Sequence, residues 1–200
     1  MRFANSWQRL RSSLCRQHEP QKSRRPLLVE HLEARTVPTI IWGAAGNRIV
    51  ADLGGPVITH ADVDLVFWGS GWNNAQTLMN NVSDSVGKIM NSSYLSGLSQ
   101  YRGIGNGQIL QTELIISSDP PSSFTDAEIQ SMLSANIRSG VLPSPSSDSQ
   151  IVYMVITQPG SSAQNIGGEH GSAVVNGTRY HYGWSINNGN LDNITDIFSH

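Results

Sequence analysis

Three short apolar runs separated by segments of helical periodicity constrain this chain's fold more than any other feature. D-V-D-L-V-F-W-G (62–69) and Q-I-V-Y-M-V-I-T (150–157) are apolar on both faces, and Q-I-L-Q-T-E-L-I-I-S (108–117) has the length of a strand. Strands that are covered on both sides of a sheet have this composition. Because helical segments lie between them, the sequence predicts an α/β fold with a mixed, largely parallel sheet and crossover helices.

The helical segments carry their own start and stop signals. After Asn74, the residues Leu78, Val82 and Val86 recur at helical spacing, which predicts the first crossover helix. Thr125 and Glu128 have the spacing of a capping box, in which each side chain binds a backbone N–H of the other residue. S-S-Y-L-S-G-L-S-Q-Y (92–101) predicts a short helix or turn between the first two strands.

The last third of the chain predicts a β-hairpin and a final helix. Asn176-Gly177 lies between two alternating runs and is typical of a tight hairpin turn, which would add an antiparallel edge to the sheet. In L-D-N-I-T-D-I-F-S-H (191–200), Asp192 or Asn193 is the expected N-cap, and Ile194, Ile197 and Phe198 the expected buried face. So short a helix is marginal alone, so we expect it to dock against the sheet or to continue beyond residue 200.

The distribution of charge separates an N-terminal tail from the rest. Residues 1–25 hold seven basic side chains and one acidic side chain, whereas the remaining residues hold six and fourteen. This asymmetry predicts a targeting or membrane-surface segment and argues against nucleic acid as a partner. Cys15 is the only cysteine, which excludes an internal disulfide and a cysteine zinc cluster, and no apolar stretch has the length of a membrane span.

These observations divide the chain into three regions. We expect residues 1–38 to be a disordered basic tail, residues 39–53 to be a linker or first strand, and residues 54–200 to be the α/β domain. R-R-P-L-L-V-E-H-L-E-A-R-T-V-P (24–38) resembles the charged sorting segment of many exported bacterial surface proteins. The resemblance implies an extracellular or cell-surface location; a solvated basic tail is the alternative.

Three of the six histidines cluster late in the chain: His170, His181 and His200. Neutral imidazole is the commonest protein ligand for zinc, and a catalytic zinc site uses three protein ligands with one open position. The three histidines are therefore the candidate metal ligands. The alternative for His170 and His181 is an ordinary surface or core histidine.

Six separated motifs occur along residues 54–200: G-G-P-V-I-T, L-V-F-W-G-S-G-W, S-S-Y-L-S-G-L-S-Q-Y-R-G-I-G, P-P-S-S-F-T-D-A-E-I-Q, G-V-L-P-S-P and L-D-N-I-T-D-I-F-S-H. Together these motifs resemble those of a family of secreted bacterial zincin-like proteins, related to zinc metallopeptidases. The opening G-G-P with an aromatic-Gly strand is also faintly similar to plant phosphate-induced (EXORDIUM-like) extracellular proteins.

The zincin-like resemblance implies a zinc cofactor, a peptide or cell-wall substrate, and His200 as a ligand on the final helix. It also implies a role, not defined further, for G-E-H-G (168–171). In the family the final helix continues from this histidine into a glutamate and a further ligand. The resemblance therefore implies that the domain is truncated at residue 200 and inactive as given, because the general base and another ligand would follow that position.

Other candidate sites have less support. Asp62 and Asp64 alternate at the start of a strand and could act on a glycoside, although a solvated strand end is the favoured interpretation. Trp68, Trp72 and Tyr101 bracket Gly- and Asn-rich loops, which gives an alternative function, a non-catalytic carbohydrate- or wall-binding protein. Core and rim packing is the favoured role of these aromatic residues. G-I-G-N-G (103–107) lacks a phosphate-loop lysine and is interpreted as a turn.

Overall fold

A five-stranded mixed sheet with the strand order β2-β1-β3-β5-β4 organises residues 54–163 and 166–199, which are the residues that the computed structural model describes. Four strands are parallel and β4 runs antiparallel to β5. The predicted α/β fold with a largely parallel sheet is confirmed. The strands are β1 (Asp62–Trp68), β2 (Gln108–Ile115), β3 (Ile151–Pro159), β4 (Gly168–Val175) and β5 (Thr178–Asn187).

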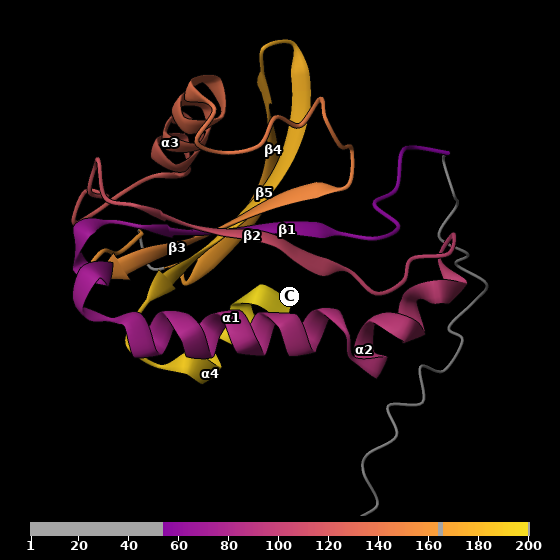
Figure 1. Cartoon of the computed structure of the whole chain (residues 1–200), viewed down its shortest axis with the longest axis horizontal. Coiled ribbons are helices and arrows are strands. Elements are labelled where there is room, and N and C mark those ends of the chain that lie inside the picture. Colours follow the sequence, from indigo (N-terminus) through magenta and orange to yellow (C-terminus); the bar gives the residue numbers. More distant parts are fainter. Residues whose placement is uncertain (1–53, 164–165, 200) are drawn as a thin grey trace, which may run out of the picture. The chain divides into compact units, whose positions relative to one another are not determined.

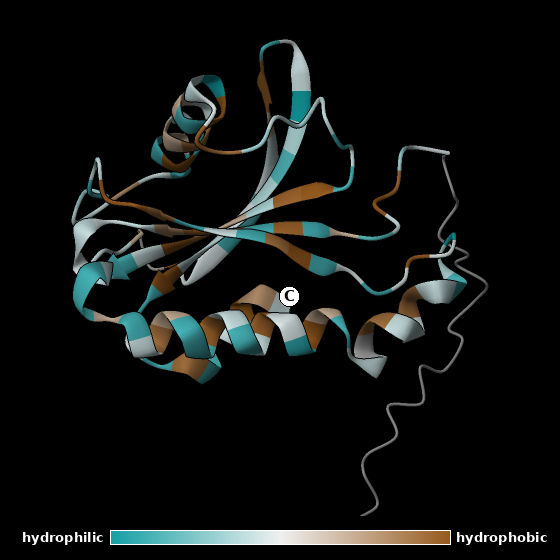
Figure 2. Ribbon diagram, in the orientation of Figure 1, coloured by the Kyte–Doolittle hydropathy of each residue, from teal (hydrophilic) through white to brown (hydrophobic). Residues whose placement is uncertain are grey.

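Helices cover both faces of the sheet (Figure 1). The helix α3 lies on one face, and α1, α2 and α4 lie on the other. The helical elements are η1 (Ser70–Asn74), α1 (Gln76–Met90), α2 (Ser93–Ser96), η2 (Gly97–Gln100), α3 (Asp126–Ser139) and α4 (Leu191–Ser199). Figure 2 shows α1 with alternating hydrophilic and hydrophobic residues, as expected of a helix with one solvated side.

The local signals for α3 and the hairpin are confirmed. Thr125 and Glu128 form the capping box at the start of α3, and Gly140 ends the helix in the left-handed conformation, with φ +78°. Asn176 and Gly177 both have positive φ, which a two-residue hairpin turn of type I′ requires. The β4–β5 hairpin therefore forms the antiparallel edge of the sheet.

Each face of the sheet has its own hydrophobic core. On β5, Tyr180, Tyr182 and Trp184 alternate with residues of the opposite face and join the core beneath α3. We call this the α3-side core; it also includes Val66, Phe124, Ile129, Leu133 and Tyr153. The α1-side core contains Leu65, Phe67, Trp72, Met79, Val82, Val86, Met154, Ile156 and Ile194.

The predicted regions 1–38 and 39–53 lie outside the described residues, so their predicted disorder and linker or strand character remain predictions. His200 also lies outside the described residues. Within the described part of the chain, no helix is long and apolar enough to cross a membrane.

Candidate functional site

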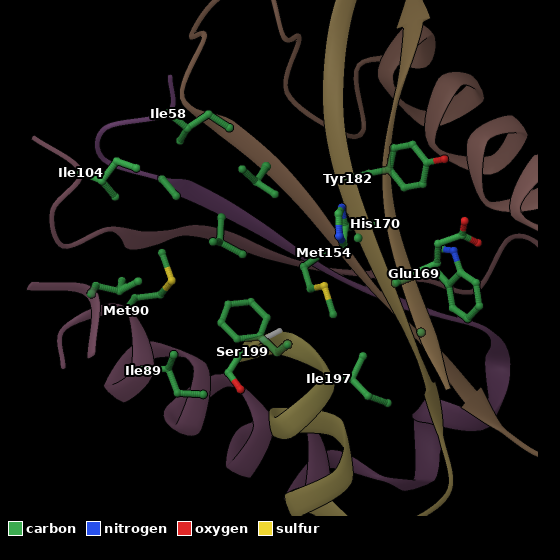
Figure 3. Close-up of a pocket in the computed structure, with 18 of the residues that line it drawn as sticks. Ile58, Ile89, Met90, Ile104, Met154, Glu169, His170, Tyr182, Ile197 and Ser199 are labelled. Carbon is green, nitrogen blue, oxygen red and sulfur yellow. The ribbon is translucent and has the colours of Figure 1, made fainter. Parts of the chain in front are cut away.

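A cavity of about 640 Å³ opens between the sheet and the ends of α1 and α4. Its floor comes from β3, its sides come from the start of β4 and the end of α1, and Leu95 of α2 contributes as well. Most of the lining is apolar, as is usual for a site that binds a ligand by burial. Figure 3 shows the arrangement, with Met90, Met154 and Ile197 around the cavity.

Glycine residues allow α4 to approach the sheet edge. A Cβ atom added to Gly168 would lie 2.3 Å from the Cγ2 atom of Ile197 and 2.5 Å from the carbonyl oxygen of Trp184. Any larger residue at this position would therefore push α4 away from β4. Gly183, opposite His170 on β5, has the Met154 Sδ atom 3.2 Å from its virtual Cβ. The absence of side chains at both positions keeps this end of the cavity open.

The final helix is docked as predicted, but its cap differs from the prediction. The helix begins at Leu191, and the side-chain oxygen of Asn190 accepts the backbone N–H of Asp192 at 2.9 Å. The prediction of Asp192 or Asn193 as the cap is therefore wrong. Asn190 can accept this N–H because it precedes the first helical residue. Ile194 is fully buried against the α1-side core, and its neighbours toward the C-terminus line the cavity.

The predicted metal ligands occupy different positions relative to this cavity. His170 lies on β4, is exposed, and lines the cavity, with its side chain pointing inward (Figure 3). His181 lies on β5 opposite Ser172, on the same face of the sheet but beyond the cavity lining. His200 lies outside the described residues and directly follows Ser199, which lines the cavity.

The described residues do not by themselves build a metal site. No group of three His, Cys, Asp or Glu side chains gathers in residues 54–163 or 166–199. Glu169 contributes to the cavity wall, but it is opposite Trp184, so its side chain lies on the α3 face of the strand. Among the described residues His170 is thus the only imidazole in the cavity.

The outer edge of β4 presents backbone hydrogen-bonding groups beside the cavity. The N–H of Ile186 donates to the carbonyl of Gly167, so residues 167, 169, 171 and 173 bond inward to β5. By alternation, the N–H and C=O groups of Gly168, His170 and Ser172 point outward. The two-residue turn gives the same pattern, because Val175 and Thr178, which flank it, form a hydrogen-bonded pair. Since β4 is the last strand, these outward groups have no ladder partner among the described residues. The sequence predicted that the hairpin adds an antiparallel edge to the sheet, but it did not show which strand is outermost or that this edge borders a cavity.

The aromatic residues of the carbohydrate alternative are largely buried. Trp72 is fully buried and its Nε1 donates to the Ile156 carbonyl at 3.2 Å, and Trp68 donates to the Ser118 carbonyl at 2.9 Å. Only Tyr101 is exposed. The favoured interpretation of core and rim packing is confirmed for Trp68 and Trp72, because a buried indole has no face available for stacking on a sugar ring.

The two aspartates at the start of β1 have different environments. Asp62 is half-buried and accepts a hydrogen bond from Gln108. Asp64 is fully buried, so the prediction of a solvated strand end is wrong for this residue. It lies on β1, an interior strand with β2 on one side and β3 on the other, so residues of both neighbouring strands flank its side chain. Short alternation of polar and apolar residues did not reveal this, because it cannot tell an edge strand from a central strand.

Burial raises the pKa of Asp64 to about 7, although a hydrogen bond from Gln111 opposes the rise and Glu113 adds to it. The Gln111 contact is long, at 3.4 Å to Oδ2, and Oδ1 has no hydrogen-bond partner. Below about pH 7, a buried carboxyl with so little compensation stays neutral, because its charged form is poorly solvated. Asp64 lies on the α3 face and therefore faces away from the cavity.

The loop 103–107 is a turn as predicted. Gly103 has φ +76°, and the loop leads into β2 and not into a helix, so it lacks the geometry of a phosphate-binding loop.

Comparison of the chain with protein-family models, with curated proteins and with solved structures finds no match.

Proposed function

We propose that residues 54–200 bind an extended polypeptide along the outer edge of β4, as part of an exported zinc metallopeptidase-like protein. The observation that carries the proposal is the position of that edge: its outward backbone groups at Gly168 and His170 border the apolar cavity, and Ser172 continues the same edge beyond it. An extended peptide can add a strand to such an edge, with main-chain hydrogen bonds for affinity and a pocket for a side chain.

The alternation of the strand supports this arrangement. The residues whose backbone groups point outward also direct their side chains to the α1/α4 face, where the cavity lies. A peptide paired with β4 would thus place every second side chain over that face. A large apolar side chain of the peptide would gain burial in the cavity at roughly 25 cal/mol per Å² of surface removed from water.

The proposed zinc depends on two histidines, one of them at the end of the chain. His170 lines the cavity. His200 follows Ser199 in the sequence, and Ser199 is the last residue of α4 and also lines the cavity. A zinc ion would supply an activated water for attack on a peptide carbonyl. Because the described residues gather no third ligand, we derive no catalytic step from them and predict metal binding without hydrolysis for the chain of 200 residues.

The proposed location outside the cell rests on the likeness of residues 24–38 to a bacterial sorting segment. The carbohydrate-binding alternative has lost its proposed stacking platform, because both Trp68 and Trp72 are buried. No other observation in the described residues favours it.

The peptide-binding part is tested by a proline at the strand edge. Proline at Ser172 removes the outward N–H donor but no ladder hydrogen bond, so an edge strand can accept it. We expect Ser172→Pro to weaken binding of an extended peptide roughly three- to tenfold by fluorescence anisotropy, as for the loss of one or more hydrogen bonds. With a peptide that has no acidic residue, Ser172→Ala, which removes the hydroxyl that contacts Arg179 but keeps the backbone N–H, should bind normally. Equal affinities of a folded Ser172→Pro variant and the original chain would contradict the proposal.

The metal part is tested separately with a chromophoric zinc indicator in competition with the protein. His170→Ala and His200→Ala should each weaken zinc binding at least tenfold. His181→Ala should change it by less than twofold, because this residue lies outside the cavity lining. Zinc binding that survives both His170→Ala and His200→Ala, or that depends on His181, would reject the proposed pair of ligands.

A further inference from the structure

A basic strip extends from the cavity along the β4–β5 hairpin. On the face of the hairpin that continues from the cavity, β5 carries Arg179 and His181, and β4 carries His170. All three side chains are exposed. The other residues of this face in the two strands are Gly168, Ser172, Val174, Gly183, Ser185 and Asn187, so the strands add no acidic group to it.

Arg179 is held in place at the far end of this strip. Its Nη1 donates to the Ser172 hydroxyl at 2.8 Å, across the strand pair. This neutral contact fixes the guanidinium over β4 and leaves its positive charge uncompensated by that partner. A guanidinium with further N–H donors is well suited to bind a carboxylate.

The cavity and the strip share one line along β4. The cavity borders Gly168 and His170, whereas Arg179 lies opposite Val174 and contacts Ser172. Neighbouring same-face positions in a strand are about 7 Å apart. A bound strand would therefore place one side chain in the cavity and another beside Arg179 when the two are separated by two or four residues.

We propose that the β4 edge selects peptides in which an acidic residue precedes a large apolar residue by two or four positions. The inference rests on the proposed peptide-binding function and names its substrate class. The acidic side chain meets Arg179 and the apolar side chain enters the cavity. The order follows from antiparallel pairing, which is slightly more stable per residue than parallel pairing: the peptide then runs from the Val174 end of β4 toward Gly168.

Four ten-residue threonine-rich peptides, measured by fluorescence anisotropy with the full chain, test the inference. The first has Glu two positions before Phe; the second has Glu directly before Phe; the third has Lys in place of Glu; the fourth has Phe two positions before Glu. We expect the first to bind about three- to fivefold more tightly than each of the others, the size of an exposed charge pair. Arg179→Ala should reduce this preference to less than twofold.

Arg138→Ala is the matched control, because Arg138 is an exposed arginine in the last turn of α3, on the other face of the sheet. It should retain the full preference. Equal binding of all four peptides, or a preference that persists in Arg179→Ala, would overturn this inference while the peptide-binding function stands. Tighter binding of the fourth peptide would overturn the proposed order. Failure of every peptide to bind would instead reject the proposed function itself.

Discussion

The two faces of the sheet are built differently. Beneath α3, the core is closed by aromatic rings whose polar atoms are satisfied: Asp126 accepts hydrogen bonds from Tyr182 Oη at 2.7 Å, Trp184 Nε1 at 3.0 Å and Gln130 Nε2 at 2.8 Å. Beneath α1 and α4, flexible methionines and glycines border an open cavity. Aromatic rings with satisfied polar atoms specify one packing, whereas methionine adapts to different neighbours. The α3 face therefore serves stability and the α1/α4 face retains space for a ligand.

The comparison predicts the largest loss of stability at Trp184. Its ring packs edge-on against Phe124, with ring centroids 5.2 Å apart, and its Nε1 donates to Asp126. Trp184→Ala should lower the free energy of unfolding by about 3–5 kcal/mol, the usual cost of removing a buried large aromatic side chain. Urea denaturation followed by circular dichroism measures this. A loss below about 1 kcal/mol would show that the α3-side core does not dominate stability.

Asp64 makes the α3 face sensitive to pH in a defined direction. Its pKa is about 7 in the folded chain, against an ordinary value of 3.8. Between these values the unfolded chain loses the proton and the folded chain keeps it, so stability falls as pH rises from about 4 to 7 and then levels off. The loss is on the order of 2–4 kcal/mol.

Asp64→Asn should remove this part of the pH dependence, because asparagine does not titrate. Urea denaturation of both proteins at pH 5 and pH 8 provides the measurement. The variant should gain stability over the original chain at pH 8 relative to pH 5. Parallel pH profiles for the two proteins would contradict a raised pKa at this position.

Truncation of a methionine on the cavity face should cost less stability than truncation of Trp184 on the α3 face. Met154 is buried, but one side of it borders the cavity, so fewer packing contacts are lost on truncation. Met154→Ala should lower the free energy of unfolding by about 1–2 kcal/mol, at or below the low end for such substitutions. Ile129→Ala, on the buried side of α3 in the α3-side core, is the matched comparison and should cost more. The reverse order in urea denaturation would remove the proposed difference between the faces.

The parts of the fold that depend on local signals were predictable from the sequence. Three such signals depend only on residues that are close in the sequence, so they can be recognised without knowing the fold. They are the capping box at Thr125, the turn at Asn176-Gly177 and the apolar runs of β1 and β3. The burial of Asp64 and the position of β4 as the outermost strand beside the cavity were not predictable, because both depend on which strands become neighbours. The cap of α4 was missed by two or three residues, since several Asn and Asp residues near position 190 could serve. His170 was a candidate from its residue type, but its place in the cavity arises from pairing with Gly183.

Two glycines, one inside α1 and one at the end of α3, give the smallest and most local test of how each face of the sheet affects stability. Gly87 lies inside α1, where a Cβ atom would approach only the Cδ1 atom of Ile109, at 3.9 Å. Alanine there should raise the free energy of unfolding by about 0.5–1 kcal/mol, because glycine is a poor helix former. Gly140 ends α3 with φ +78° and has open space around it. Alanine there should lower the free energy by about 1 kcal/mol through backbone strain alone. In urea denaturation, the two substitutions should change the free energy of unfolding in opposite directions, because the positions differ in φ and both have room for a methyl group. Changes in the same direction would mean that crowding, and not backbone conformation, decides the outcome.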